Sequence, residues 1–259
     1  MNGEMFVREL GSGPTILALH GTPSPAEDFM PLAERLASRY RVLVPDLPGY
    51  GKSPAPADAG YEAVDALVAD TLAARGARRL RAIIGFSSGG YRALEMVLRK
   101  RIETDLVIGL GAIADFDETG RTMRDQLGST LDANPQFLYG PEIRDMFRQL
   151  MLSPAWAESH PHDLERVYQW VKITSPAALA AEAHAMARMP NLRPELGRMP
   201  ARVYLRVGAL DLGAPPAVSE EIARLVPRAS IDVVPGCGHT LLIEDLEGTI
   251  SAIERELAA

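Results

Sequence analysis

Short apolar runs that alternate with amphipathic segments constrain the fold of this chain more than any other feature. Four runs have the length of a strand and almost continuous hydrophobicity: Thr15–His20, Arg41–Asp46, Arg81–Phe86 and Asp105–Leu110. Such runs are typical of strands buried on both faces of a parallel sheet. The segments between them carry apolar residues at spacings of three and four, as amphipathic helices do. The alternation predicts an α/β fold with a mostly parallel central sheet flanked by helices.

The alternation of expected strands and helices is interrupted once and then resumes. Strands are expected within 201–211 and 229–240, and a closing helix over 241–257. The intervening segment shows no buried strand, only helical pieces separated by prolines and glycines. It holds both tryptophans, three of the six phenylalanines and six of the ten methionines. We predict a core formed by 1–114 together with 200–259, and a helical cap inserted at 115–199 that covers one end of the sheet.

Composition narrows the partners and the compartment. The chain has 259 residues, 47% of them hydrophobic, so it can bury one large core, and its formal charge of −7 argues against a nucleic-acid partner. Its start lacks the pattern of a signal peptide, and no apolar run approaches the roughly 20 residues that span a membrane. The one cysteine, Cys237, excludes an intrachain disulfide and fits a reducing compartment. We therefore expect a cytoplasmic protein without a membrane partner, and its oligomeric state, monomer or homodimer, stays open.

The segment from Arg81 to Leu98 places two serines among three glycines, between an expected strand and an expected helix. A residue on a sharp strand-to-helix turn needs an unusual backbone conformation, and its neighbours two positions away must be small. Only Ser87 has glycine at both of these positions, Gly85 and Gly89, because a phenylalanine stands two positions before Ser88. We predict that Ser87 is a nucleophile and that the backbone N–H of Ser88 faces the developing oxyanion.

A serine nucleophile needs a base, and the base needs an acid that orients it. His239 follows the last expected strand in a glycine-bounded loop, at the carboxyl edge of the sheet where open α/β folds place their sites. We predict that His239 is the base. Asp211 follows the preceding strand in a loop of small residues, and Asp115 follows a neighbouring strand. We favour Asp211 as the acid and keep Asp115 as the alternative.

The other histidines are weaker candidates. His160 and His162 lie beside prolines within the insertion, and no further cluster of ligands supports a metal there. His184 lies in an expected helix and is interpreted as a packed or surface residue. We predict no metal and no organic cofactor.

Four motifs resemble the α/β-hydrolase fold superfamily, and the resemblance spans nearly the whole chain. The motifs are His-Gly-Thr-Pro at 20–23, Asp-Leu-Pro-Gly-Tyr-Gly-Lys-Ser at 46–53, Gly-Phe-Ser-Ser-Gly at 85–89, and the pair Ala-Leu-Asp at 209–211 with Gly-Cys-Gly-His at 236–239. The chain order Ser, Asp, His also matches that of the family. The resemblance implies that the N–H of Thr22 is the second oxyanion donor and that His20 holds its loop. The short N-terminus leaves room for one of the family's antiparallel strands.

The resemblance implies a capped serine hydrolase that cleaves a carboxylic ester or lactone of a small to medium apolar substrate through an acyl-enzyme. We expect aromatic residues of the cap to form the substrate wall, namely Phe137, Phe147, Trp156 and Trp170. A C–C hydrolase or an acyltransferase could use the same three residues. A non-catalytic receptor on this fold is a further alternative.

Overall fold

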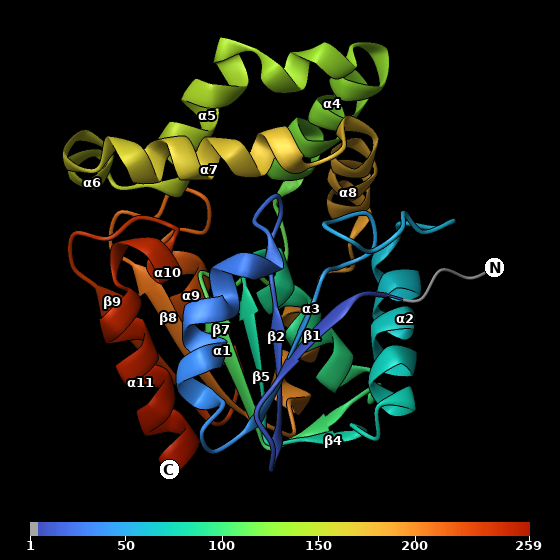
Figure 1. The fold of residues 1–259 in the computed structure, drawn as a ribbon, viewed down its shortest axis with the longest axis vertical. Helices are drawn as coiled ribbons and strands as arrows, with labels where there is room; N and C mark the ends of the chain where they lie inside the picture. The colour runs from blue at the N-terminus through green and yellow to red at the C-terminus, as the bar shows by residue number, and fades with distance from the viewer. Residues whose placement is uncertain (1–4) are drawn as a thin grey trace.

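The computed structural model describes residues 5–259 and shows a seven-stranded sheet beneath a layer of helices (Figure 1). In spatial order the strands are β1 (Val7–Leu10), β3 (Arg41–Pro45), β2 (Thr15–Leu19), β5 (Ala82–Phe86), β7 (Leu106–Leu110), β8 (Arg202–Gly208) and β9 (Ala229–Val234). Neighbouring strands are parallel except β1, which pairs with β3 in the antiparallel sense. The predicted mostly parallel α/β sheet is confirmed.

Burial explains why the strand pattern was legible in the sequence. Every residue of β5 and β7 is buried, since helices cover both faces of the sheet at its centre. The edge strand β9 is only partly buried, with intermediate and exposed positions and no fully buried one. Two short strands, β4 (Arg79–Leu80) and β6 (Glu103–Thr104), form a separate parallel pair that the sequence pattern did not indicate.

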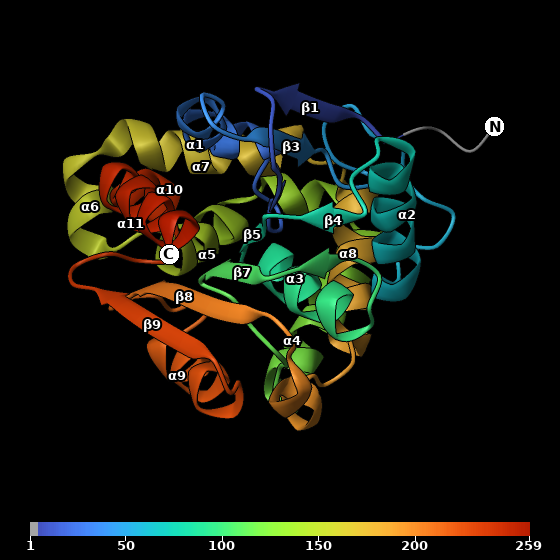
Figure 2. The ribbon, with the colours of Figure 1, turned by 90° about the horizontal axis from the view of Figure 1, so that it is seen from below.

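Two groups of helices enclose the sheet (Figure 2). One face is covered by α2 (Tyr61–Ala74), α3 (Ser88–Leu98) and α9 (Pro216–Leu225). The other face is covered by the 3-10 helix η1 (Ala26–Phe29), α1 (Met30–Leu36), α10 (Leu241–Glu244) and α11 (Leu246–Ala258). None of the helices within residues 5–259 is long and apolar enough to cross a membrane.

The prediction of one closing helix over 241–257 was wrong at one residue. Asp245 leaves the helical conformation, with φ −142° and ψ 52°, and separates α10 from α11. Its carboxylate is paired with Arg206, a buried side chain of β8. This long-range ion pair gives Asp245 a partner outside the helix, which local periodicity does not reveal.

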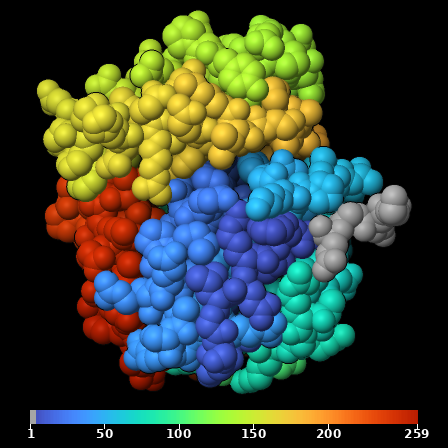
Figure 3. Space-filling view, viewed as in Figure 1, coloured from blue at the N-terminus to red at the C-terminus, as the bar shows by residue number. Residues whose placement is uncertain are grey.

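A layer of helices lies over the carboxyl edge of the sheet and forms the upper part of the molecule (Figures 1 and 3). Its elements are α4 (Glu118–Ala133), η2 (Pro135–Tyr139), α5 (Pro141–Met151), α6 (Pro154–Ser159), α7 (Pro161–Ile173) and α8 (Pro176–Arg188). Proline opens α5 through α8, where its missing N–H has no partner to lose. The layer has its own apolar cluster, which includes Leu138, Val167 and Val171.

The helical layer ends before the boundary expected at residue 199. Residues after Arg188 return to the sheet and form the 3-10 helix η3 (Arg193–Arg198). Leu192, Leu196 and Met199 are buried in the same cluster as the sheet residue Val203. By its packing, this segment lies with the core, and the division of the chain into two domains stays a prediction.

A buried ion network ties this layer to the core. Arg92 of α3 donates to Asp65 of α2 at 2.6 Å and contacts Glu182 of α8 at 3.3 Å. Tyr61 stacks against the guanidinium at 3.9 Å and donates its hydroxyl to Glu182. Burial alone would lower the pKa of Arg92, but the two carboxylates outweigh it and raise that pKa. Arg92 therefore stays charged and joins three helices in the interior.

Replacing Arg92 with leucine should leave two buried carboxylates without their positive partner. Removing one partner of a buried ion pair costs about 3–5 kcal/mol. We expect Arg92→Leu to lower the free energy of unfolding in urea by a similar amount. The matched control is Arg99→Leu at the C-terminal end of the same helix, because its ion pair with Glu195 is about one-third exposed on each side. Equal losses in the two variants would contradict a special role for the buried network.

Candidate active site

The backbone turns sharply at Ser87, between β5 and α3. Its angles, φ 53° and ψ −118°, fall in a region that residues with a side chain rarely adopt. A Cβ added to Gly85 would lie 2.3 Å from the carbonyl oxygen of Gly89, and one added to Gly89 would lie 2.3 Å from that of Leu19. The close packing of strand and helix thus requires glycine two positions before and two positions after Ser87.

The two serines differ in their surroundings. Ser87 is partly accessible, whereas Ser88 is 1% exposed and its hydroxyl lies 3.4 Å from the hydroxyl of Thr22. Ser88 also has the helical conformation of the first residue of α3. Its side chain is therefore enclosed, and the group that it can offer to a ligand is its backbone N–H.

His239 and Asp211 meet at the carboxyl ends of adjacent strands. The Nδ1 of His239 lies 2.7 Å from Oδ2 of Asp211, and each residue is 2% exposed. The other carboxylate oxygen accepts the backbone N–H of Ala214 at 2.7 Å. A carboxylate at Nδ1 holds the proton on that nitrogen and leaves Nε2 as the basic nitrogen of the ring.

Close packing fixes the plane of the His239 ring. A Cβ on Gly111 would lie 3.0 Å from the ring, and one on Gly213 would lie 3.2 Å from it. The ring of Phe86 lies on a further side, with 4.8 Å between the ring centroids. Since Phe86 directly precedes Ser87, this contact brings the histidine to the turn that carries the serine.

Asp115, the alternative acid, is engaged elsewhere. Its carboxylate pairs with Arg121 of α4 and, at 2.8 Å, with Arg193 of η3. These contacts hold the start of the helical layer against the core. The geometry thus brings Asp211, rather than Asp115, to His239.

The loop after β2 packs directly on the serine turn. A Cβ on Gly21 would lie 2.9 Å from Cβ of Ser87 and 2.8 Å from the carbonyl oxygen of Phe86. The hydroxyl of Thr22 accepts that of Tyr50 at 3.2 Å. Thr22 and Ser88 therefore lie side by side next to Ser87.

His20 is a structural residue of the same loop. It is fully buried, its Nε2 accepts the N–H of Leu47, and its Nδ1 lies 2.9 Å from the carbonyl oxygen of Gly21. Burial lowers the pKa of His20, so the ring is neutral and both nitrogens are engaged. Its role matches the loop-holding role that the family resemblance implied.

Glu244 supports the histidine loop and was not recognised in the sequence. Its buried carboxylate accepts the N–H of Gly238, next to His239, and the N–H of Ser153, between α5 and α6. One side chain thus connects the loop that carries His239 to the helical layer. A single glutamate in an expected helix carries no local signal for this role.

A cavity of about 160 Å³ lies between the helical layer and the loop after β2 that carries Thr22. Apart from Thr22 and Arg124, its lining is apolar and rich in methionine. The apolar lining residues are Pro23, Met123, Leu127, Met146, Phe147, Leu150, Met151, Leu179, Ala183 and Met186. The thioether side chains are flexible and can adapt to ligands of different shape.

The four aromatic residues expected to form a substrate wall are not gathered in one place. Phe147 lines the cavity beside Thr22, and Trp170 lines a much smaller space beside Phe86. Trp156 instead stacks on His160, with 3.8 Å between ring centroids, and Phe137 packs against the apolar cluster of the layer. Phe147 is thus the one of the four that borders the larger cavity, whereas Trp170 is buried in the apolar cluster of the layer, and their role in substrate binding stays a prediction.

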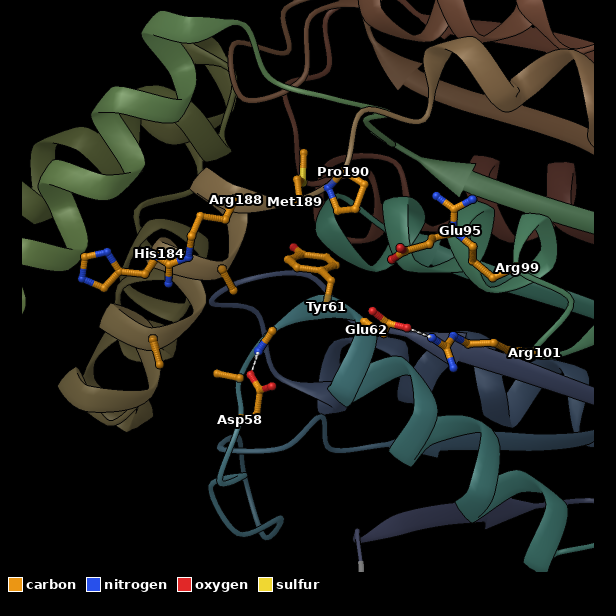
Figure 4. A pocket seen from close by; sticks show the side chains of 14 residues that line it. Asp58, Tyr61, Glu62, Glu95, Arg99, Arg101, His184, Arg188, Met189 and Pro190 are labelled. Carbon is orange, nitrogen blue, oxygen red and sulfur yellow. Dashed lines mark hydrogen bonds and ion pairs between the residues drawn. The ribbon is translucent and has the colours of Figure 1, made fainter.

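A separate cavity of about 520 Å³ lies between α2, α3 and α8 (Figure 4). Glu95 and Arg99 lie on one side of Tyr61, and His184 and Arg188 on the other. Burial and the nearby Asp65 raise the pKa of Glu95 to about 7. All four basic side chains of the lining have acidic partners: Arg99 pairs with Glu195, Arg101 with Glu62, His184 with Asp125 and Asp132, and Arg188 with Asp125. The lining contains no residue of the loop that carries Thr22, of the Ser87 turn or of the histidine loop, so we do not place the active site there. Within residues 5–259 no group of three His, Cys, Asp or Glu side chains could hold a metal ion.

The fold and this site define a hydrolase built on an α/β sheet, and comparisons with known proteins name the family. A model of the alpha/beta hydrolase family matches residues 16–252. The chain therefore belongs to the alpha/beta hydrolase family.

Individual relatives agree with this assignment. The chain is 24% identical to a pimeloyl-[acyl-carrier protein] methyl ester esterase of Nitrosomonas europaea, over 96% of this chain and 98% of the relative. It is 30% identical to a 2-(acetamidomethylene)succinate hydrolase of Mesorhizobium japonicum, over 95% and 89%. The solved structure of a thermophilic esterase from Thermogutta terrifontis superposes with a TM-score of 0.89 at 26% identity, over 98% and 93%.

The strain at Ser87 can be tested by comparing the free energy of unfolding of glycine and alanine variants. Glycine adopts positive φ without cost, so we expect Ser87→Gly to be more stable than Ser87→Ala by about 1 kcal/mol or more in urea unfolding. The matched control is Ser88, one residue further on in helical conformation, where glycine should be less stable than alanine by about 0.5–1 kcal/mol. The same order of stability at both positions would argue against strain at the turn.

Proposed function

We propose that this α/β hydrolase is a serine esterase that cleaves a carboxylic ester or lactone of a small to medium, largely apolar substrate. The observation that carries the proposal is the buried hydrogen bond between Asp211 and His239, whose ring contacts Phe86 next to Ser87. The named activity of the esterase relatives, 24–26% identical over almost the whole chain, supports ester cleavage.

In the proposed mechanism, Oγ of Ser87 attacks the ester carbonyl while Nε2 of His239 takes its proton. Asp211 keeps the other proton on Nδ1 and stabilises the imidazolium. The protonated histidine then gives its proton to the departing alcohol, which leaves an acyl-enzyme. Water then attacks the acyl group while His239 takes a proton from it. His239 returns this proton to Oγ of Ser87 as the carboxylic acid leaves.

The oxyanion of both steps would lie against the backbone N–H groups of Thr22 and Ser88. These residues follow two different strands, β2 and β5, but their hydroxyls lie 3.4 Å apart, so both backbones border one space beside Ser87. One donor of this kind lowers the barrier by about 3 kcal/mol in serine hydrolases. The reaction drawn here requires no metal or organic cofactor.

The helices α4 to α8 act in this proposal as a cap that excludes water and contacts the substrate. The cavity that borders Thr22 is lined by cap side chains on its other sides, among them Phe147 and Met151. An apolar enclosure strengthens the electrostatic interactions that stabilise the oxyanion.

The nucleophile is tested by esters of graded acyl length together with a fluorophosphonate probe. We expect Ser87→Ala to abolish probe labelling and to lower kcat by a factor on the order of 10⁶. Ser88→Ala is the control and should retain most activity, because its proposed contribution is a backbone N–H. A probe adduct on Ser88, or a wild-type protein that binds esters without hydrolysing them, would refute the mechanism.

The acid is tested by isosteric amides. We expect Asp211→Asn to lower kcat about 10⁴-fold at neutral pH, because an amide at this place favours the wrong tautomer of His239. Asp115→Asn should have a far smaller effect on kcat, since the partners of Asp115 are Arg121 and Arg193. The reverse ranking of the two variants would transfer the role to Asp115.

A further inference from the structure

One charged side chain lines the otherwise apolar cavity beside the oxyanion loop. Arg124 of α4 borders the same space as Thr22, and the remaining lining residues carry no charge. Within the part of the chain that the structure describes, Arg124 forms no ion pair. The other arginines at the ends of α4 and α8 do, because Arg121 is paired with Asp115 and Arg188 lies 3.8 Å from Asp125.

Neutral groups hold the Arg124 guanidinium in place. It lies 3.2 Å from the ring centroid of Phe116, and its Nη1 donates to the carbonyl oxygen of Gly120 at 3.0 Å. Burial lowers the pKa of Arg124 to about 10, which still leaves the group protonated at neutral pH. A guanidinium has five N–H donors, and among the residues that the structure describes Arg124 uses one of them, so donors are left for a ligand.

A partly desolvated cation without an ion-pair partner is unfavourable in the free protein. The charge of Asp117 favours the protonated Arg124, but burial outweighs it and the pKa still falls. A carboxylate of the substrate would supply an ion-pair partner, and the planar fork of arginine matches a carboxylate through two parallel hydrogen bonds. The apolar, methionine-rich remainder of the cavity suits a hydrocarbon segment between the carboxylate and the ester.

We propose that Arg124 is a specificity-determining residue that binds a free carboxylate of the substrate, so that the preferred substrates are half-esters of dicarboxylic acids. This inference rests on the proposed ester hydrolysis at Ser87. It adds the chemical class of the substrate, an apolar chain with an ester at one end and a carboxylate at the other.

The test compares matched p-nitrophenyl esters: monoesters of dicarboxylic acids of five to eight carbons, and neutral alkanoate esters of equal length. We expect the wild-type enzyme to prefer the charged member of a pair. Arg124→Gln should lower kcat/KM for that member by about 10–100-fold more than for the neutral one, mainly through KM. Arg124→Lys should restore part of the preference. The melting temperature of each variant is measured first.

Arg148→Gln is the matched control, since it removes one positive charge from an exposed position of the cap helix α5. It should leave both members of each pair unaffected. If Arg124 only holds Phe116 and Gly120 together, Arg124→Gln will slow both esters of a pair equally, and the inference falls.

Failure of the inference and failure of the proposed function give different results. A wild-type enzyme that cleaves neutral esters and shows no preference for charged ones overturns the role of Arg124 and leaves the esterase proposal standing. If no ester is cleaved, calorimetric titration with the free dicarboxylic acids tests Arg124 directly. Binding that Arg124→Gln weakens at least tenfold supports the inference, and equal or undetectable binding to both proteins refutes it.

Discussion

The close approach of α3 to β5 and β2 is the constraint on which the site depends. Gly85 and Gly89 leave so little room that a single added methyl group on either would overlap a backbone carbonyl. This contact forces the chain to reverse within one residue, and Ser87 takes the strained conformation that results. The strain persists because the buried strand and the buried helix on either side determine the path of the backbone.

Parallel strands bring the remaining groups to the same edge. The loops after β2, β8 and β9 carry Thr22, Asp211 and His239, and each loop follows the carboxyl end of its strand. Since these ends lie together in a parallel sheet, residues that are far apart in the chain become neighbours. The helical layer lies over this edge, and Glu244 links the layer to the histidine loop by accepting N–H groups from both.

Two interior arginines show how the protein treats buried charge differently in the core and at the site. Arg92 is surrounded by Asp65 and Glu182, so its charge is compensated within the protein and joins α3 to the cap. Arg124 lines the cavity, and among residues 5–259 it donates to a carbonyl oxygen, packs over an aromatic ring and forms no ion pair. An arginine without an ion-pair partner can bind an anionic group of a ligand. The charge of Arg92 is already balanced by two carboxylates and serves to hold the helices together.

The sequence by itself determined the α/β class, the four central strands, and Ser87 as the residue on the turn, because hydrophobic periodicity and glycine spacing are local signals. It favoured Asp211 but kept Asp115 as an alternative, since each follows a strand and only the packed structure decides which carboxylate reaches His239. The break at Asp245 and the clamp formed by Glu244 were likewise invisible, because their partners are distant in the chain. The same reason separates Phe147, which lines the cavity, from Trp156, which stacks on His160. Their positions in the sequence place both in the inserted helical segment, and only tertiary packing decides which way each one faces.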